Sequence, residues 1–175
     1  MKQNFLRTAL LLASVILLAL SCKKEVNKQE QPQEEFATTI GTANNPTFNL
    51  EVILRGEDGR LGHIKFRQDV DPSKIIVLDT WVRDLEPNHQ YLLQRAVDAA
   101  NVVDGDCTST GWLTLGKGLT PQSILTDDNG TGSEELWRDV STAASGTAFD
   151  IHFRVVDATT MTVVLTSNCY QYVVR

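Results

Sequence analysis

The sequence predicts an all-β fold, an antiparallel β-sandwich of about eight or nine strands that follows an apolar leader and a flexible tether. Apolar residues alternate with polar ones from Thr47 onward, which is the period of a half-buried strand. Turn-forming residues separate these runs at short intervals, as in sandwiches. Only the stretch around residues 95–103 has the pattern of a helical turn. Hydrophobic residues make up 42% of the chain, enough to build a core.

The first two strands are expected to form a hairpin. Residues 56–59 read Gly-Glu-Asp-Gly, which is turn chemistry, and the second strand carries Ile64 and Phe66. Further strands are expected at residues 74–83, 90–97, 111–115, 124–126, 134–140, 148–156 and 162–174. The apolar face of the first strand consists of Phe48, Leu50, Val52 and Leu54.

One short motif narrows the fold. Residues 85–91 read LEPNHQY, which resembles the L-x-P-x-x-x-Y segment of fibronectin type III and immunoglobulin-like domains. The resemblance implies that the Tyr91 hydroxyl bonds back to the chain and fixes the turn before the next strand. More chain follows this motif than a fibronectin domain has, so we expect a related sandwich with extra strands.

The first residues have the order of an export signal. Lys2 and Arg7 precede an apolar run at residues 10–18 that is shorter than the roughly 20 residues of a membrane span. Residues 18–22, LALSC, resemble the lipobox of bacterial lipoproteins, with Ala19 where the commonest form has leucine. The resemblance implies cleavage before Cys22, a diacylglycerol thioether on that cysteine and an acyl chain such as palmitate on its amine. The alternative is an ordinary signal peptide that leaves a free thiol.

These features divide the chain into three parts. Residues 1–21 are the lipoprotein signal peptide, residues 22–46 are the lipidated cysteine and a tether, and residues 47–175 are the β-sandwich domain. The tether is rich in Lys, Glu, Gln and Asn, so it cannot bury enough apolar surface to offset its ordering entropy. Several acyl chains anchor a protein stably. We therefore expect attachment to a membrane of the cell envelope, the outer membrane first, facing the periplasm or the surface.

The charge of the chain excludes one class of partner. Removing the leader, which holds two basic residues and no acid, changes the net charge from −6 to −8. An acidic domain repels phosphate backbones, so no nucleic acid is expected as a partner.

Two cysteines remain after the lipidated one. Because exported proteins meet an oxidising compartment, we expect a disulfide between Cys107 and Cys169. Two separate buried thiols are the alternative.

The sequence contains no strong catalytic motif. It lacks the G-x-S-x-G turn of serine hydrolases, and the expected disulfide uses both domain cysteines. His63, His89 and His152 are dispersed and lack the close pairing of zinc ligands. We therefore expect a protein without enzymatic activity, without a cofactor and without a metal site. One segment is an alternative candidate for a metal site. Asp127, Asp128 and Asn129 precede a glycine and are candidate calcium ligands, but their spacing favours a hairpin turn.

Tryptophans are the candidate ligand-binding residues. Trp81 is expected in the core, whereas Trp112 and Trp137 lie in short, polar-flanked strands and could stack on a sugar ring. The leading hypothesis is a non-enzymatic binding or adhesion module that contacts a glycan, a peptide or a protein. The second is a structural or accessory subunit of an envelope complex, and the third is a hydrolase with unrecognised carboxylates.

Overall fold

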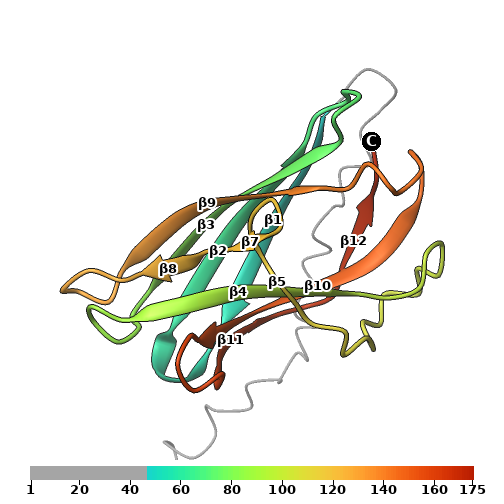
Figure 1. The fold of residues 1–175 in the computed structure, drawn as a ribbon. Helices are drawn as coiled ribbons and strands as arrows, with labels where there is room; N and C mark the ends of the chain where they lie inside the picture. The colour runs from blue at the N-terminus through green and yellow to red at the C-terminus, as the bar shows by residue number, and fades with distance from the viewer. Residues whose placement is uncertain (1–46) are drawn as a thin grey trace, which may run out of the picture. The chain divides into compact units, whose positions relative to one another are not determined.

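The computed structural model of the chain describes residues 47–175. The predicted signal peptide, the lipidation site Cys22 and the tether lie outside the described residues. The described part is all-β, and hydrogen bonds connect its twelve strands into one nearly closed sheet (Figure 1). Within residues 47–175, no helix has the length and apolar character needed to cross a membrane.

Four long strands form the first wall of this sheet. They are β1 (Phe48–Arg55), β2 (Leu61–Gln68), β3 (Ile75–Arg83) and β9 (Gly132–Asp139), and each pairs antiparallel with the next. A 3₁₀ turn at Glu57–Gly59 connects β1 to β2. The hairpin predicted from the sequence is therefore confirmed.

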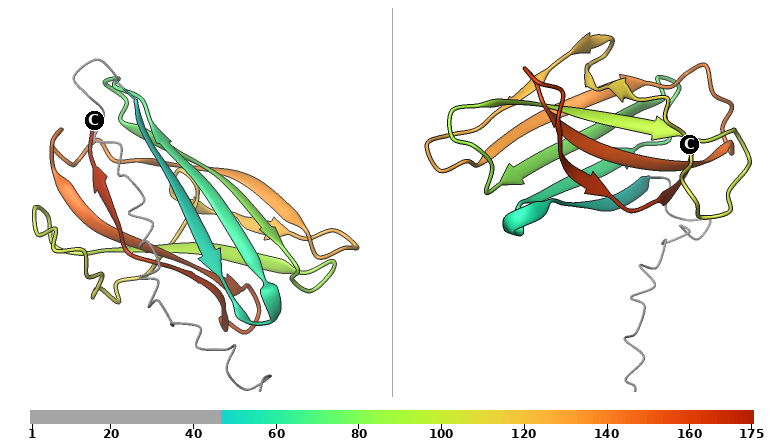
Figure 2. Two further views of the ribbon diagram at one scale, coloured as in Figure 1. Left: turned by 180° about the vertical axis from the view of Figure 1, so that it is seen from behind. Right: turned by 90° about the horizontal axis from the view of Figure 1, so that it is seen from below.

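The opposite wall is centred on β10, as two further views show (Figure 2). β10 (Ala148–Asp157) pairs with β4 (Gln90–Val97) on one side, and on the other with β11 (Val163–Ser167) and β12 (Tyr170–Val173). All of these pairings are antiparallel.

The two walls are connected along both sides. On one side β11 pairs with β1 at Leu54 and Arg55. On the other, β5 (Leu113–Thr114) pairs with β4, and β6 (Gly116–Lys117) follows it and pairs with β9, so one segment passes from wall to wall. The short strands β7 (Thr120–Pro121) and β8 (Ser123–Leu125) complete this side by pairing with β6 and β4. The all-β prediction is confirmed, but the sheet is continuous and does not divide clearly into a two-sheet sandwich.

The last expected strand, residues 162–174, is interrupted. β10 pairs Arg154 with Thr166 of β11 and Ile151 with Tyr170 of β12. Between these two pairs β10 advances by three residues and the opposing chain by four, so the opposing chain has one extra residue. This extra residue is a β-bulge, and the Ser167 hydroxyl accepts the freed N–H of Phe153 at 2.9 Å. Before the bulge the odd-numbered Leu165 points inward, and after it the even-numbered Tyr172 and Val174 do. The expected helical turn at residues 95–103 is wrong at its start, because β4 continues to Val97.

The core lies between the walls and follows the expected alternation. Val52, Leu54, Ile64 and Phe66 are fully buried. One expectation is wrong: Trp81 is 36% exposed. On β3 the even-numbered residues point inward, and the buried ones are Ile76, Leu78, Thr80 and Val82. Three apolar side chains at alternate positions outweigh one tryptophan in deciding which face of a strand is buried.

The two expected tertiary contacts are present. The Tyr91 ring is 2% exposed, and its hydroxyl accepts a hydrogen bond from the Glu86 N–H at 3.0 Å. Cys107 and Cys169 form a disulfide with their Cα atoms 5.3 Å apart. The bond attaches the loop after β4 to the bulge between β11 and β12.

Candidate binding pocket

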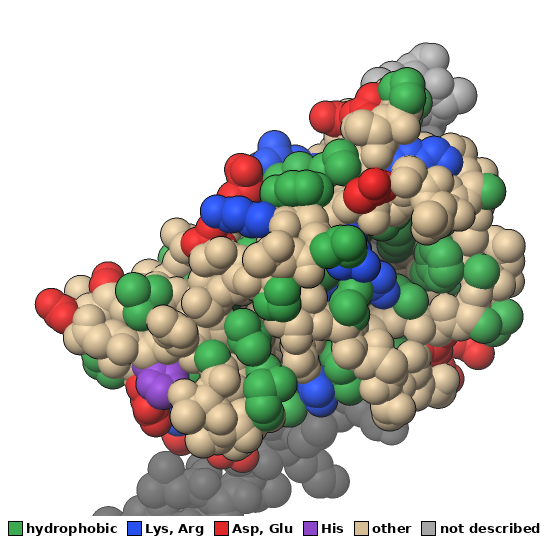
Figure 3. Space-filling view, in the orientation of Figure 1, with side chains coloured by type: hydrophobic (Ala, Val, Ile, Leu, Met, Phe, Trp, Pro, Cys, Tyr) green, Lys and Arg blue, Asp and Glu red, His purple; other side chains and the backbone are tan. Residues whose placement is uncertain are grey.

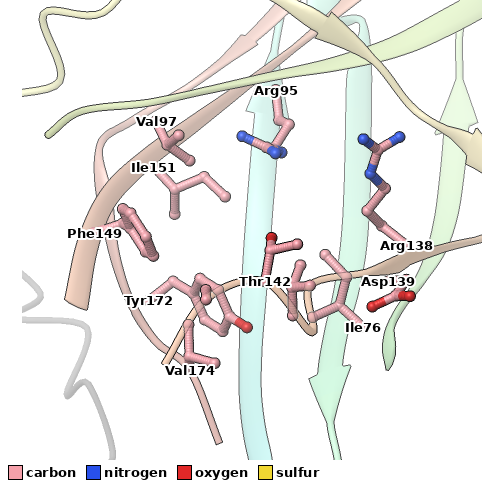
Figure 4. A pocket seen from close by; sticks show the side chains of 12 residues that line it. Ile76, Arg95, Val97, Arg138, Asp139, Thr142, Phe149, Ile151, Tyr172 and Val174 are labelled. Atoms are coloured by element: carbon pink, nitrogen blue, oxygen red, sulfur yellow. The ribbon is translucent and has the colours of Figure 1, made fainter. Parts of the chain in front are cut away.

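A pocket opens where the ends of both walls meet. Its volume is about 210 Å³, and it lies between the C-terminal ends of β4 and β9 and the start of β10. The surface view shows a hollow with hydrophobic walls and Lys or Arg side chains beside it (Figure 3). The close-up shows two arginines above an apolar wall (Figure 4). That wall is formed by Ile76, Val97, Phe149, Ile151 and Val174.

The arginines occupy positions that the strand pattern assigns to the core. On β4 the inward side chains are Tyr91, Leu93, Arg95 and Val97. On β9, Arg138 comes two residues after the buried Leu136 and therefore lies on the same inward face. β4 and β9 belong to opposite walls, so the two guanidinium groups enter the pocket from opposite sides. Both side chains are half-buried.

The Arg95 guanidinium is partly desolvated. It has no hydrogen bond or ion pair with any residue in 47–175. Burial first, and then the positive charge of Arg138, lower the pKa of Arg95 from its ordinary value, although an arginine stays protonated in proteins. Arg138 donates one hydrogen bond at 3.3 Å, from Nη1 to the Gly118 carbonyl oxygen. Two like charges thus share a partly dry site with little neutralisation.

The other polar groups of the pocket are engaged elsewhere. The Tyr172 hydroxyl donates to Gln68 Oε1 at 2.7 Å, and burial raises the pKa of this tyrosine. The Asp139 carboxylate accepts the Ser141 N–H at 2.7 Å, and this bond is the main reason that the pKa of Asp139 is lowered. Asp139 forms no ion pair with Arg138. The pocket therefore presents two cations, the exposed carboxylate of Asp139 and a wall of apolar carbon.

The structure places the tryptophans differently from their sequence interpretation. Trp112 is half-buried: its ring lies 4.5 Å from that of His152, and the Arg154 Cζ lies 4.1 Å from its centroid. Trp137 is 38% exposed on the outer face of β9. Neither tryptophan lines the arginine pocket.

The candidate calcium loop is a tight turn between β8 and β9. One Asp127 carboxylate oxygen accepts the N–H groups of Asn129 and Thr131 at 2.8 and 2.9 Å, and these bonds lower the pKa of Asp127. Asp128 accepts a bond from the Asn88 amide at 2.8 Å. Within residues 47–175, no group of three or more His, Cys, Asp or Glu side chains is arranged to hold a metal.

The histidines lie apart from one another and from the pocket. His63 pairs with Glu51 on the outer face of the first wall. His89 Nε2 lies 2.7 Å from Asp157, and His152 Nε2 lies 3.0 Å from the Ser109 carbonyl. Each histidine therefore makes its own structural contact, whereas the sequence showed only that the three are dispersed along the chain.

Sequence reasoning missed Arg95 and Arg138, although a signal existed. In a strand with alternating burial, a charged residue at an inward position costs free energy unless something compensates it. Arg95 stands between Leu93 and Val97 in such a pattern. The pattern does not show that a second arginine on another strand lies opposite, because strand order is not encoded by periodicity.

Comparison with known proteins gives no guide to this site. No protein-family model, curated protein or solved structure matches the chain. The function is therefore argued from the pocket itself.

Proposed function

We propose that this chain is a lipid-anchored, non-enzymatic binding protein of the bacterial cell envelope, whose domain holds a small acidic ligand between Arg95 and Arg138. The observation that carries the proposal is the pair of inward arginines without carboxylate partners. The location rests on the leader and on Cys22, with the outer membrane as the expected membrane. Protease treatment of intact cells distinguishes a periplasmic domain from one that faces the surface.

The charge of the ligand follows from the energetics of the pocket. Removing an arginine from water costs several kcal/mol, and a carboxylate or phosphate on a ligand offsets this cost by charge-assisted hydrogen bonds. The rest of the chain is acidic, with a net charge near −8 after the leader is removed. Two cations without carboxylate partners, gathered in one hollow of an acidic protein, are best explained by an anion that binds there.

The size and lining of the pocket define the remainder of the ligand. A volume of about 210 Å³ is below the roughly 300 Å³ at which pockets for drug-sized molecules begin. The ligand is therefore a small molecule or the end group of a larger one. Its body is apolar, since Phe149, Ile151 and Val174 form the wall opposite the arginines.

Among residues 47–175, one histidine is hydrogen-bonded to an aspartate, and no nucleophile lies beside this pair. This supports a non-enzymatic role. Within residues 47–175, the His89 ring bonds to Asp157 and to no serine or threonine hydroxyl. The Thr126 hydroxyl nearby is bonded to main-chain groups of Glu86 and His89. The pair stabilises the corner before β4 and leaves no group to attack a substrate.

The finer fold assignment is also part of the proposal. The Tyr91–Glu86 hydrogen bond supports a relation to immunoglobulin-like sandwiches, in which a tyrosine makes such a contact. The two facing walls are consistent with that relation, and the continuous sheet is the feature that departs from it.

The proposal is tested by calorimetric titration of the whole chain in mild detergent with hexanoate, benzoate and hexyl phosphate. Hexanamide is the neutral analogue of hexanoate. We expect the acids to bind and the amide to bind at least tenfold more weakly. Arg95→Met and Arg138→Met should each weaken acid binding at least tenfold, because a charge-assisted hydrogen bond contributes about 1.5–3 kcal/mol.

A stability measurement separates loss of the site from loss of the fold. Arg95→Met should leave the free energy of unfolding without ligand unchanged or higher, because an uncompensated charge is replaced by an apolar group of similar length. Arg83→Met, an exposed arginine on β3, is the matched control and should bind like the natural chain. Equal binding of hexanoate and hexanamide, or no binding by any of the acids, would contradict the proposal.

A further inference from the structure

The two walls differ in what covers their outer faces. On β4 the outward residues Gln94 and Ala96 are 4% and 0% exposed, because the loop and short strands that follow β4 lie over them. On the other wall the outward residues Trp81 of β3 and Trp137 of β9 are 36% and 38% exposed. The turn between β6 and β7 lies against part of the Trp137 ring, since a Cβ atom built at Gly118 would lie 2.8 Å from it, and the rest of that ring is exposed. Large aromatic side chains that stay exposed on a sheet face are unusual, since such faces are normally polar.

The two tryptophans share one face of adjacent strands. Trp81 pairs with Ser133, and Trp137 pairs with Val77. They are therefore separated by four residues along the strands, which is about 14 Å at 3.4 Å per residue. The Arg83 Cζ lies 5.8 Å from the centre of the Trp81 ring, within cation–π range. Both rings belong to long, hydrogen-bonded strands rather than to mobile loop tips.

Two acids lie directly opposite each other between the rings. Asp79 pairs across the strands with Glu135, an arrangement that destabilises a sheet by repulsion. Arg67 neutralises Asp79 through a bond of 2.5 Å. The Glu135 carboxylate has no partner among residues 47–175. It is left free to accept hydrogen bonds from a ligand.

A groove runs beside Trp81 on this face. Its volume is about 540 Å³, within the range of small-molecule sites, and its lining includes Lys65, Asp79, Ser133 and Glu135. The Lys65 amine and the Ser133 hydroxyl also lack a partner within the described residues. The groove thus combines one aromatic ring with a free donor, a free acceptor and a hydroxyl that can act as either.

We infer that this face is a second binding site, which takes a neutral oligosaccharide with one sugar ring stacked on Trp81 and the chain extending toward Trp137. A pyranose ring has an apolar C–H face that packs on indole, and hydroxyls that need both donors and acceptors at its edge. The site is separate from the arginine pocket and does not depend on the function proposed for it.

Other ligand classes fit this face less well. A lipid needs a continuous apolar surface, whereas charged residues separate the two tryptophans. A nucleic acid or an acidic glycan would meet the unpaired Glu135 carboxylate and the acidic charge of the chain. A neutral glycan carries no such penalty and uses both aromatic rings.

The test is titration of the whole chain in mild detergent, followed by tryptophan fluorescence and calorimetry. The ligands are the β1,4-linked hexasaccharides of glucose and of N-acetylglucosamine, the α1,4-linked glucose hexasaccharide, and the corresponding disaccharides. At least one hexasaccharide should bind at millimolar concentration or below. Trp81→Ala should weaken that binding at least tenfold. Trp137→Ala should weaken hexasaccharide binding but not disaccharide binding, because a disaccharide cannot reach from one ring to the other.

Two control variants make the result specific. Leu125→Ala removes an exposed apolar side chain on a different strand, β8, and should bind like the natural chain. Arg95→Met removes the pocket cation and should also leave glycan binding unchanged. The inference is overturned if none of the three hexasaccharides binds, or if binding persists in the Trp81→Ala variant at the natural affinity.

Discussion

At the scale of single residues, the structure uses side chains to complete the main-chain hydrogen bonds of its loops. The Asp157 carboxylate accepts the N–H groups of Thr159 and Thr160 at 2.7 and 2.8 Å and pairs with His89. Asp98 does the same for Thr108 and Ser109. A carboxylate that accepts several N–H bonds is favoured in its charged form, so such loops lose stability when they are protonated.

The pKa of Asp157 provides a pH test of this principle. Hydrogen bonding by the Thr160 N–H first, and then by Thr159 and His89, lowers this pKa to about 2. The unfolded chain has an aspartate pKa near 3.9, so it binds the proton more readily than the folded chain does. The stabilisation is present above about pH 4 and is lost as the pH falls through about 2.

The natural chain should therefore lose free energy of unfolding between about pH 4 and pH 2 more steeply than Asp157→Asn does. Urea unfolding at several pH values measures both curves. Above pH 5 the two curves should run parallel. Equal slopes below pH 4 would show that Asp157 does not contribute to acid stability.

Gly130 combines a left-handed backbone conformation with a main-chain clash for any side chain. Its φ is +73°, and a Cβ atom built there would lie 2.1 Å from the main-chain oxygen of Leu85. Gly130→Ala should lower the free energy of unfolding by at least about 3 kcal/mol, because strain and a main-chain clash add. Gly59→Ala is the matched control: Gly59 has a φ of +79° with nothing within 4 Å, so about 1 kcal/mol is expected. Similar losses in both variants, measured by urea unfolding, would refute the clash.

At the scale of elements, the position of the Cys107–Cys169 bond depends on the bulge between β11 and β12. The extra residue bends the strand and separates the pairing of β11 from that of β12. Cys169 lies in this interruption rather than on a regular inward position, so it can reach the loop that follows β4. The same loop is also held by Asp150, which accepts the N–H groups of Asp104 and Gly105 at 2.9 Å.

Removing the disulfide should destabilise the domain substantially. The cysteines are 62 residues apart, and the chain-entropy model gives about 4 kcal/mol for a loop of this length. The double variant Cys107→Ser, Cys169→Ser should show this loss in urea unfolding. A reductant should destabilise the natural chain by a similar amount and leave the double variant unchanged. A natural chain that is indifferent to the reductant would show that the bond contributes little.

At the scale of the whole molecule, the proposed lipid anchor would determine where the two proposed binding surfaces act. Cys22→Ser should abolish the incorporation of labelled palmitate and release the chain from the membrane fraction, because the acyl chains supply the anchoring free energy. Immunoblots of fractionated cells measure the release. Membrane retention of an unlabelled variant would mean that something other than the lipid anchors the chain.

Protease treatment of intact cells then distinguishes the two orientations. Loss of the domain from Thr47 onward in intact cells would place both proposed binding surfaces outside the cell. Loss only after lysis would place them in the periplasm and restrict the ligands to that compartment. The lysed sample is the control for protease access.

The sequence by itself determined the local features of this protein. Alternation located the six strands of eight or more residues, with the limits of β4 correct to the residue, and the expected export predicted the disulfide. The Tyr91 contact followed from one motif. The strands and the Tyr91 contact depend on neighbours in the chain, which the sequence displays directly, and the disulfide was predicted from the oxidising compartment that the leader leads us to expect.

Only the tertiary structure decided where the candidate sites are. Period-two alternation shows which residues share a strand face, but not which strands oppose each other, so it could not bring Arg95 and Arg138 together. Nor could it show that Trp81 points outward, because both faces of β3 carry apolar residues and the packing of Ile76, Leu78 and Val82 decides between them. Burial is a property of the assembled sheet, and the free energy that orients each strand is the sum over all its contacts rather than the preference of one residue.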